Sequence, residues 1–449
     1  MHQTGSNKHT VEPGKVRRRM WVVGILLLAL GALTWELIYH DDPPPDDADL
    51  VPHWSERGGD ANPLAVLCST LGSSPIRDYE RLPHAVTACE PGQEAAIERY
   101  LATQSLALDA FRAIVQTDRT RWQWPEREAM TVTHYASTNA RACTQLAGTL
   151  ELKVHVLRSG GQADAAARLC LELAAFGDGL MHAEGDCIHL LTGRFILNQA
   201  EEQLLSCLSR MDAKNAPFLR HCLRELALIE GPARTDVQFV LRVDHQSLAR
   251  RIDPAEMNAL HQDRWEAHGL ALTIKRQRTL GLHQKQVSPT LEGLKSTWRE
   301  GLLAEREAAQ VRQQLKPSQA GWRFYFDTNV VGRLILSMEG GYRDVIEAMM
   351  ETVVLHRQTR LHLALRLHEL EKGSLPVHLE DLVPAYLPEV PVDEFSGNSM
   401  RWDVTRKMLY SMGRNMKDDG GSVEPARRKQ AKDLGFAYAW SNVPAPLKE

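Results

Sequence analysis

The stretch "LYSMGRNMKDDGG", Leu409–Gly421, contains side chains whose types and spacing could bind a metal ion. Asp418 and Asp419 are adjacent carboxylates, and Asn415 and Ser411 add two neutral oxygens. Calcium takes about six to eight oxygen ligands from carboxylates, carbonyls and water. The sequence therefore predicts a candidate calcium loop, with a plain polar turn as the alternative, because Asp and Gly also form ordinary tight turns. The spacing is not that of an EF-hand.

A second group of possible ligands lies in "HAEGDCIH", whose candidate members are His182, Glu184, Asp186, Cys187 and His189. Their spacing matches no zinc pattern. The segment also coincides with a break between two predicted helices, where Gly and Asp are common. We therefore expect a structural turn rather than a metal centre.

Three histidines recur every six residues in a later helical pattern: His356, His362 and His368. Six residues correspond to about 600° of helical rotation, so neighbouring histidines lie about 120° apart. They do not share a helix face, which argues against a joint metal site.

The common catalytic signatures are absent from the sequence. It contains no nucleophile elbow, HExxH, P-loop or GxGxxG, and 57 acidic residues offer too many carboxylate pairs to single one out. The net charge of −4 gives no argument for nucleic-acid binding. We assign no catalytic or cofactor-binding residue and leave open whether the chain is an enzyme.

The N-terminal region has the pattern of a membrane anchor. A basic tail, residues 1–19, precedes twenty mostly apolar residues, Met20–Tyr39, which as a helix would span about 30 Å. Aromatic residues stand at both ends, and the positive-inside rule places the N-terminus in the cytoplasm. We expect a single-pass protein of a bacterial cytoplasmic (inner) membrane with its bulk exported. The alternative is a cleaved signal peptide ending near Ala29–Gly31.

The segment after the anchor, residues 40–54, is rich in proline and aspartate. Consecutive prolines favour an extended, semi-rigid chain. We expect this segment to act as a stalk that holds the folded part away from the membrane.

Seven cysteines are present, and an exported domain can form disulfides. Cys68 and Cys89 lie in a loop-rich stretch and are the best candidate pair. The others fall among apolar residues of predicted helices, where a buried free thiol is the default.

Residues 55–340 read as a helical domain, because apolar residues recur at spacings of three, four and seven. Short glycine-bearing breaks between the helices indicate a bundle or hairpin array. The predicted stripes are Leu146, Leu150, Val154 and Leu157; Leu169, Leu173 and Phe176; and Leu191, Phe195, Leu204, Leu208 and Met211. Residues 272–319 are rich in charge, and we expect a solvated helical segment there.

Residues 341–449 predict a long helix, Gly341–Lys372, followed by a small β module. Gly373 ends the helix. A short helix is expected near Leu379–Val383, a hairpin from "MRWDV" and "KMLYSM", and a third strand within Leu434–Trp440. The fold class is thus mainly α, with a small C-terminal α+β module.

This C-terminal module resembles the globular head of the G-type, or major, pseudopilin of type II secretion. The shared features are a helix ending in Gly, "DLVPAYLPEVPVDEF", Gly397, the hairpin, "LYSMG" and the acidic-glycine loop. In that family this loop holds calcium, so the resemblance implies the same here. The pseudopilin's N-terminal signature is missing, and Asp433 is displaced by "EPARRKQAK". The whole chain is similar to membrane-anchored helical proteins of planctomycete and verrucomicrobial type, which implies a fold and location but no reaction.

Together these patterns favour a membrane-anchored envelope protein with a structural or protein-interaction role and a protein partner. Two alternatives remain: an extracytoplasmic enzyme with a site between helices, and an accessory subunit of a secretion or pilus-like system. An exposed apolar groove would favour the first hypothesis. A cluster of carboxylates or histidines with perturbed pKa values would favour the enzyme.

Overall fold

The computed structural model describes residues 13–38, 40–55, 62–125, 138–209, 211–253, 274–316, 329–338, 340–421 and 433–437. Within these ranges the chain is mainly helical, as the sequence predicts. The α-helices are α1 (Pro13–Ile38), α2 (Pro63–Ser73), α3 (His84–Thr87), α4 (Glu94–Thr103), α5 (Ser105–Ile114), α6 (Thr138–Ser159), α7 (Ala163–Met181), α8 (Cys187–Leu208), α9 (Ala216–Leu226), α10 (Arg234–Arg251), α13 (Arg276–Ser296), α14 (Trp298–Leu315), α16 (Val330–Met338) and α17 (Arg343–Lys372). Short 3₁₀ helices are η1 (Ala48–Leu50), η2 (Pro75–Arg81), η3 (Arg119–Arg121), η4 (Ala213–Asn215) and η6 (Leu379–Leu382).

The chain forms two compact units, and they do not follow the predicted domain boundaries. The smaller unit comprises residues 1–47, 249–284 and 311–340, and the larger unit comprises residues 48–248, 285–310 and 341–449. The predicted boundary at residue 340 therefore separates no independent C-terminal domain. The physical reason is α17, which packs against α8 and α9 and also against strands of the C-terminal module.

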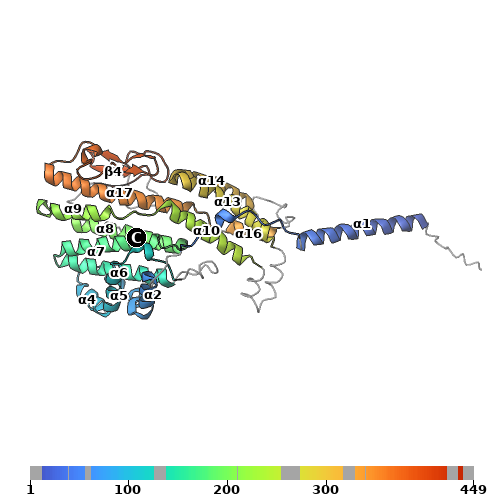
Figure 1. Cartoon of the computed structure of the whole chain (residues 1–449), viewed down its shortest axis with the longest axis horizontal. Coiled ribbons are helices and arrows are strands. Elements are labelled where there is room, and N and C mark those ends of the chain that lie inside the picture. Colours follow the sequence, from blue (N-terminus) through green and yellow to red (C-terminus); the bar gives the residue numbers. More distant parts are fainter. Residues whose placement is uncertain are drawn as a thin grey trace, which may run out of the picture. The chain divides into compact units, whose positions relative to one another are not determined.

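The larger unit is built around the antiparallel helices α6, α7 and α8, with α9 and α17 alongside them (Figure 1). The closest packing is between α7 and α8, where Gly177 and Gly193 face each other. A Cβ added to Gly193 would lie 2.6 Å from the carbonyl oxygen of Gly177 and 2.6 Å from Met181 Cγ. Two glycines thus allow the helix backbones to approach more closely than side chains would permit.

The predicted stripes on α6 and α7 are confirmed, but the one on α8 is wrong in its first half. Phe195 is 48% exposed and Leu191 is only partly buried. The buried face instead runs through Leu190, Gly193 and Leu197 before it rejoins the predicted residues at Leu204. The close contact between Gly177 and Gly193 determines which face of α8 is buried. A pattern based on large apolar residues does not include glycine.

The C-terminal module has the predicted strands. β3 (Arg401–Asp403) pairs antiparallel with β4 (Met408–Ser411), which also pairs antiparallel with β5 (Leu434–Ala437). A separate two-stranded ladder joins β1 (Val392–Asp393) and β2 (Asn398–Ser399). The long helix ends as expected, with Gly373 at φ 76° in the left-handed region, and η6 is the expected short helix.

The expectation of a solvated segment at residues 272–319 is wrong for its described part. Leu280, Leu294 and Trp298 on α13 and α14 are buried. Glu305 is also fully buried, and its carboxylate accepts hydrogen bonds from the Thr290 hydroxyl and the Tyr342 backbone N–H. The charge-rich composition hid a buried face because several of its members are polar groups with internal partners.

The smaller unit includes α1 and the beginning of the predicted stalk. The Asp41 carboxylate accepts hydrogen bonds from the backbone N–H groups of Gln277 and Arg278 in the first turn of α13. Asp42 pairs with the guanidinium of Arg278 at 3.0 Å. Further along, in the larger unit, Leu50 is fully buried. The segment is thus packed against folded structure rather than extended as a free stalk. The reason is that its aspartates interact with the N-terminus of α13.

Large apolar side chains cover the surface of α1. Trp21, Ile25, Leu28 and Trp35 are each at least 60% exposed. Among the described residues, no helix meets the length and hydropathy expected of a bilayer crossing.

All seven cysteines are free. The predicted pair is wrong, because Cys68 belongs to the main core whereas Cys89 packs against a separate small cluster around Ile97. The default of buried free thiols on helices holds for Cys143, Cys170 and Cys207.

Candidate functional site

The acidic-glycine loop is a hydrogen-bonded turn in which each carboxylate has protein partners. Asp418 accepts a hydrogen bond from the Gly420 N–H and forms an ion pair with Arg401 at 2.8 Å. Asp419 accepts a hydrogen bond from the Asn415 side-chain N–H₂ at 2.6 Å. Gly420 and Gly421 adopt positive φ angles, as a tight turn requires. Of the four predicted ligands, Asp418, Asp419 and Asn415 therefore lie together.

The fourth predicted ligand, Ser411, lies in a different cluster. Its buried hydroxyl donates to Asp393 Oδ1 at 2.6 Å, and the same carboxylate accepts from the N–H groups of Phe395 and Met412. Asp433 is displaced in sequence by "EPARRKQAK", but in the structure it accepts hydrogen bonds from the N–H groups of Asp419 and Gly421. The register of β5 returns Asp433 beneath the loop, which could not be seen from the spacing.

The same loop is attached to the long helix through Arg414. Its guanidinium forms a two-point ion pair with Glu351 of α17, and it also lies 3.4 Å from Glu347. Glu347 is 1% exposed and has two further cationic partners, Arg343 at 2.9 Å and Arg306 at 3.3 Å. This cluster anchors the C-terminal module to the helical body.

The "HAEGDCIH" segment is a structural turn, as expected. His182 lies between Asp178 and Asp236; burial opposes its charge, but the hydrogen bonds to these two carboxylates raise the pKa of His182 to about 10. Asp186 caps the N-terminus of α8 and bonds His189 Nδ1 at 2.7 Å. A general acid or base needs a pKa near the working pH, which His182 does not have. Among the described residues, no group of three or more His, Cys, Asp or Glu side chains is arranged to hold a metal ion.

The three histidines of α17 have separate partners, as their spacing predicts. His356 is hydrogen-bonded to the Glu201 carboxylate of α8, His362 to the Gln358 carbonyl, and His368 to the Ser374 carbonyl. Burial lowers the pKa of His362 to about 4, so this ring is neutral at pH 7. These contacts hold the helix packing and form no shared site.

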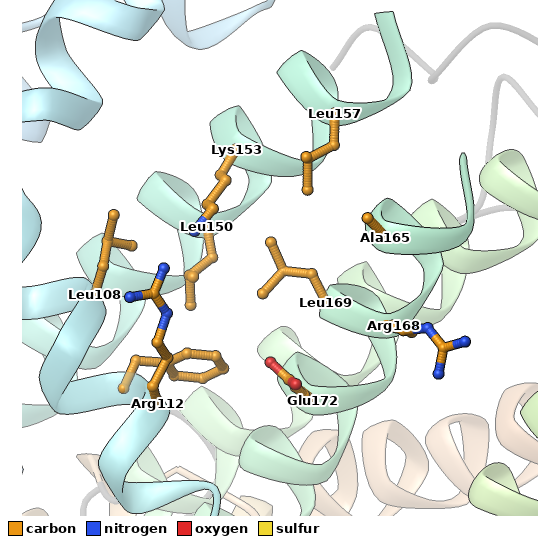
Figure 2. Close-up of a pocket in the computed structure, with 10 residues that line it drawn as sticks. Leu108, Arg112, Leu150, Lys153, Leu157, Ala165, Arg168, Leu169 and Glu172 are labelled. Atoms are coloured by element: carbon orange, nitrogen blue, oxygen red, sulfur yellow. The ribbon is translucent and has the colours of Figure 1, made fainter. Parts of the chain in front are cut away.

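A groove of about 210 Å³ lies between α5, α6 and α7 of the larger unit (Figure 2). Leu150 and Leu157 are seven residues apart on α6, and Ala165 and Glu172 are seven residues apart on α7. The groove is thus about two helical turns long, or roughly 10 Å. In Figure 2 Leu169 points from α7 toward the side chains of α6, and the apolar lining consists of Leu108, Phe111, Leu150, Leu157, Ala165 and Leu169.

Charged side chains form the rim of this groove. Arg112 pairs with Asp109 on its own helix at 2.7 Å. Burial and the nearby Arg112 lower the pKa of Lys153, and burial raises the pKa of Glu172. Within the described part of the chain, Lys153 Nζ has no hydrogen bond or ion pair. Arg168 points away from the groove (Figure 2). Its guanidinium lies over the ring of Phe218, 5.0 Å from the ring centroid.

The groove is not apparent from the sequence, because the spacing of the leucines of α6 and α7 is that of core residues. Most of them are indeed buried, and only Leu157, near the C-terminal end of α6, is partly exposed. A weak signal was present: Arg112 and Lys153 stand beside apolar stripes at positions that face the same space.

Comparisons of the chain with protein-family models, with curated proteins and with solved structures found no match.

Proposed function

We propose that this chain is a membrane-anchored protein of the bacterial envelope that binds a protein partner through the groove between α5, α6 and α7. The observation that carries the proposal is the apolar lining of the groove, in which Leu157 is partly exposed and which the ammonium of Lys153 borders. Helix-in-groove recognition uses apolar anchors at such spacings.

The size of the groove supports a protein segment over a metabolite. Ligand pockets for small molecules enclose about 300–1,000 Å³, and this groove is smaller. Two turns of helix match anchors at positions i and i+7 of a partner helix. The proposed partner is therefore an amphipathic helical segment with two apolar anchors and a carboxylate that pairs with Lys153.

The enzyme alternative has less support from the side chains. The Asp186–His189 and Glu201–His356 contacts are internal and serve helix packing or capping. The cluster of His182 with Asp178 and Asp236 has a perturbed pKa, but a value of about 10 is far from the pKa that a general acid or base needs near neutral pH. An accessory role in a secretion system rests on the resemblance of the C-terminal module alone. Co-purification with pseudopilins would favour it.

Membrane anchoring is supported by the exposed apolar surface of α1, which needs a nonpolar surrounding. The full-length chain should remain with membranes after alkaline carbonate extraction, and deletion of residues 20–39 should release it. Release of the intact chain would contradict the anchor.

The groove is tested in the native host with a photoreactive phenylalanine analogue placed at Leu157. The matched control carries the analogue at Leu228, which is 64% exposed and does not line the groove. We expect a discrete cross-linked protein from position 157 and none from position 228. Equal cross-linking at both positions, or none at either, would count against the groove.

A further inference from the structure

A second cavity, of about 380 Å³, lies beside the "HAEGDCIH" turn and is independent of the groove. Residues of that turn, of the adjoining ends of α7 and α8, and of α10 line it. Its size lies within the range of small-molecule sites. The lining combines opposite charges with an apolar patch, which consists of Met181, Leu190, Phe239 and Val240.

Arg242 provides an open position for an anion. Its Nε donates to the Asp49 carbonyl oxygen at 2.9 Å, which fixes the side chain. Within the described residues, its two terminal N–H₂ groups have no partner. A fixed guanidinium with free terminal groups suits a carboxylate, which it can bind through two parallel hydrogen bonds.

Asp236 provides an open position for a cation on the same helix. Its Oδ2 accepts from the Ala233 N–H at 2.7 Å and pairs with His182 at 3.0 Å. Its Oδ1 has no hydrogen bond among the described residues. Asp236 and Arg242 both line the cavity, although they are six residues apart on α10, about 120° around the helix and about 9 Å along its axis. Helical side chains lean toward the N-terminus, so the long side chain of Arg242 leans toward Asp236, and the two open positions can receive the two charges of one small molecule.

From this arrangement we infer that the cavity binds a zwitterion, namely a free α-amino acid with an apolar side chain. The carboxylate lies on Arg242, the ammonium on Asp236, and the side chain on the patch that contains Phe239.

The segment 48–55 borders this cavity at three lining residues. Asp49 holds Arg242, Trp54 packs edge-on against Phe239 with ring centroids 4.8 Å apart, and the N–H of Ser55 donates to Glu184 at 3.1 Å. Glu184 has a positive φ of 52°, a conformation that costs energy for a residue with a side chain.

Calorimetry on the full-length chain tests the inference with L-leucine, L-methionine and L-phenylalanine as probes. We expect saturable binding of at least one of them. The Arg242→Gln variant should bind it roughly tenfold or more weakly, because a charged two-point contact is lost. Arg224→Gln, an exposed arginine of α9, is the matched control and should leave the affinity unchanged.

A second measurement on the native chain does not depend on any variant folding. For the amino acid that binds, the amine without its carboxylate and the acid without its ammonium should each bind at least tenfold more weakly. The inference is overturned if none of the three probes binds at 10 mM (about the limit of weak specific binding). It is also overturned if Arg242→Gln binds as well as the native chain, or if either single-charge analogue binds equally.

Discussion

Arg414 and Glu351 form a two-point ion pair, with Nε–Oε1 at 2.5 Å and Nη2–Oε2 at 2.8 Å. The pair joins the loop after β4 to the N-terminal third of α17. It explains why the C-terminal module belongs to the larger unit rather than standing apart. A hairpin of such short strands gains little stability alone and needs packing against a helix.

The first prediction concerns this pair. Arg414→Gln removes a charged partner from Glu351 and from the nearly buried Glu347. Because Arg414 is itself 45% exposed, we expect a loss of about 1–3 kcal/mol in the free energy of unfolding, below the cost for a fully buried pair. Urea denaturation measures it.

The matched control is Arg406→Gln, which breaks the exposed pair with Asp403 within the β3–β4 hairpin. Exposed pairs contribute little, so no measurable change is expected. Equal effects of the two substitutions would show that Arg414 has no anchoring role.

The second prediction concerns the contact of α7 with α8. Gly193→Ala places a methyl group 2.6 Å from the Gly177 carbonyl oxygen, so the helices must separate. We expect destabilisation by about 1–3 kcal/mol. Gly72→Ala in α2, where a Cβ meets nothing within 4 Å, should instead be neutral or stabilise by about 0.5–1 kcal/mol. Thermal unfolding of both variants compares them, and a neutral Gly193→Ala would contradict the close packing.

The third prediction concerns pH. Burial, with a smaller contribution from Glu202, raises the pKa of Glu151 from 4.5 to about 8. Between about pH 4.5 and pH 8, the folded chain therefore keeps a proton on Glu151 that the unfolded chain has lost. The contribution of Glu151 to the stability of the folded chain is complete below about pH 4.5 and is lost as the pH rises through about 8.

Glu151→Gln should remove this pH dependence and raise stability at pH 8.5 relative to the native chain, by on the order of 3 kcal/mol. Unfolding at pH 5, 6.5 and 8.5 measures the effect. Glu98→Gln, an exposed position on α4, serves as the control and should leave the slope unchanged. A native slope that persists in Glu151→Gln would refute the assignment.

The fourth prediction concerns the acidic-glycine loop. Arg401 holds Asp418 and the Asn415 amide donates to Asp419, so an ion would have to displace both partners. We predict no saturable heat when calcium is titrated into the full-length chain. Heat that disappears in Asp418→Ala/Asp419→Ala would establish the loop as a calcium site and support the pseudopilin resemblance.

The sequence predicted the helices and strands better than the contacts between them. The long helix, its end at Gly373 and the hairpin follow from local periodicity and turn chemistry. The α8 face was wrong because Gly193, rather than a large apolar residue, sets the contact. The buried face of α13 and α14 was hidden because residues such as Glu305 are polar but internally paired.

The candidate sites depended more strongly on long-range packing. Asp418, Asp419 and Asn415 were found by spacing because they lie in one turn. Asp433 and Arg414 were not, since β5 and α17 bring their partners from distant parts of the chain. The groove depends on three helices at once, so the local pattern of Arg112 and Lys153 beside apolar stripes was only a weak signal of it.

The central claim is that the groove binds a protein partner, and its most direct test is cross-linking from Leu157 in two charge-reversed backgrounds. Lys153→Glu places a like charge against the proposed carboxylate of the partner, whereas Arg99→Glu reverses an exposed charge on α4, outside the groove. The account predicts that Lys153→Glu lowers the cross-linked yield at least several-fold while Arg99→Glu leaves it unchanged. Equal yields in the native chain and in Lys153→Glu would contradict it.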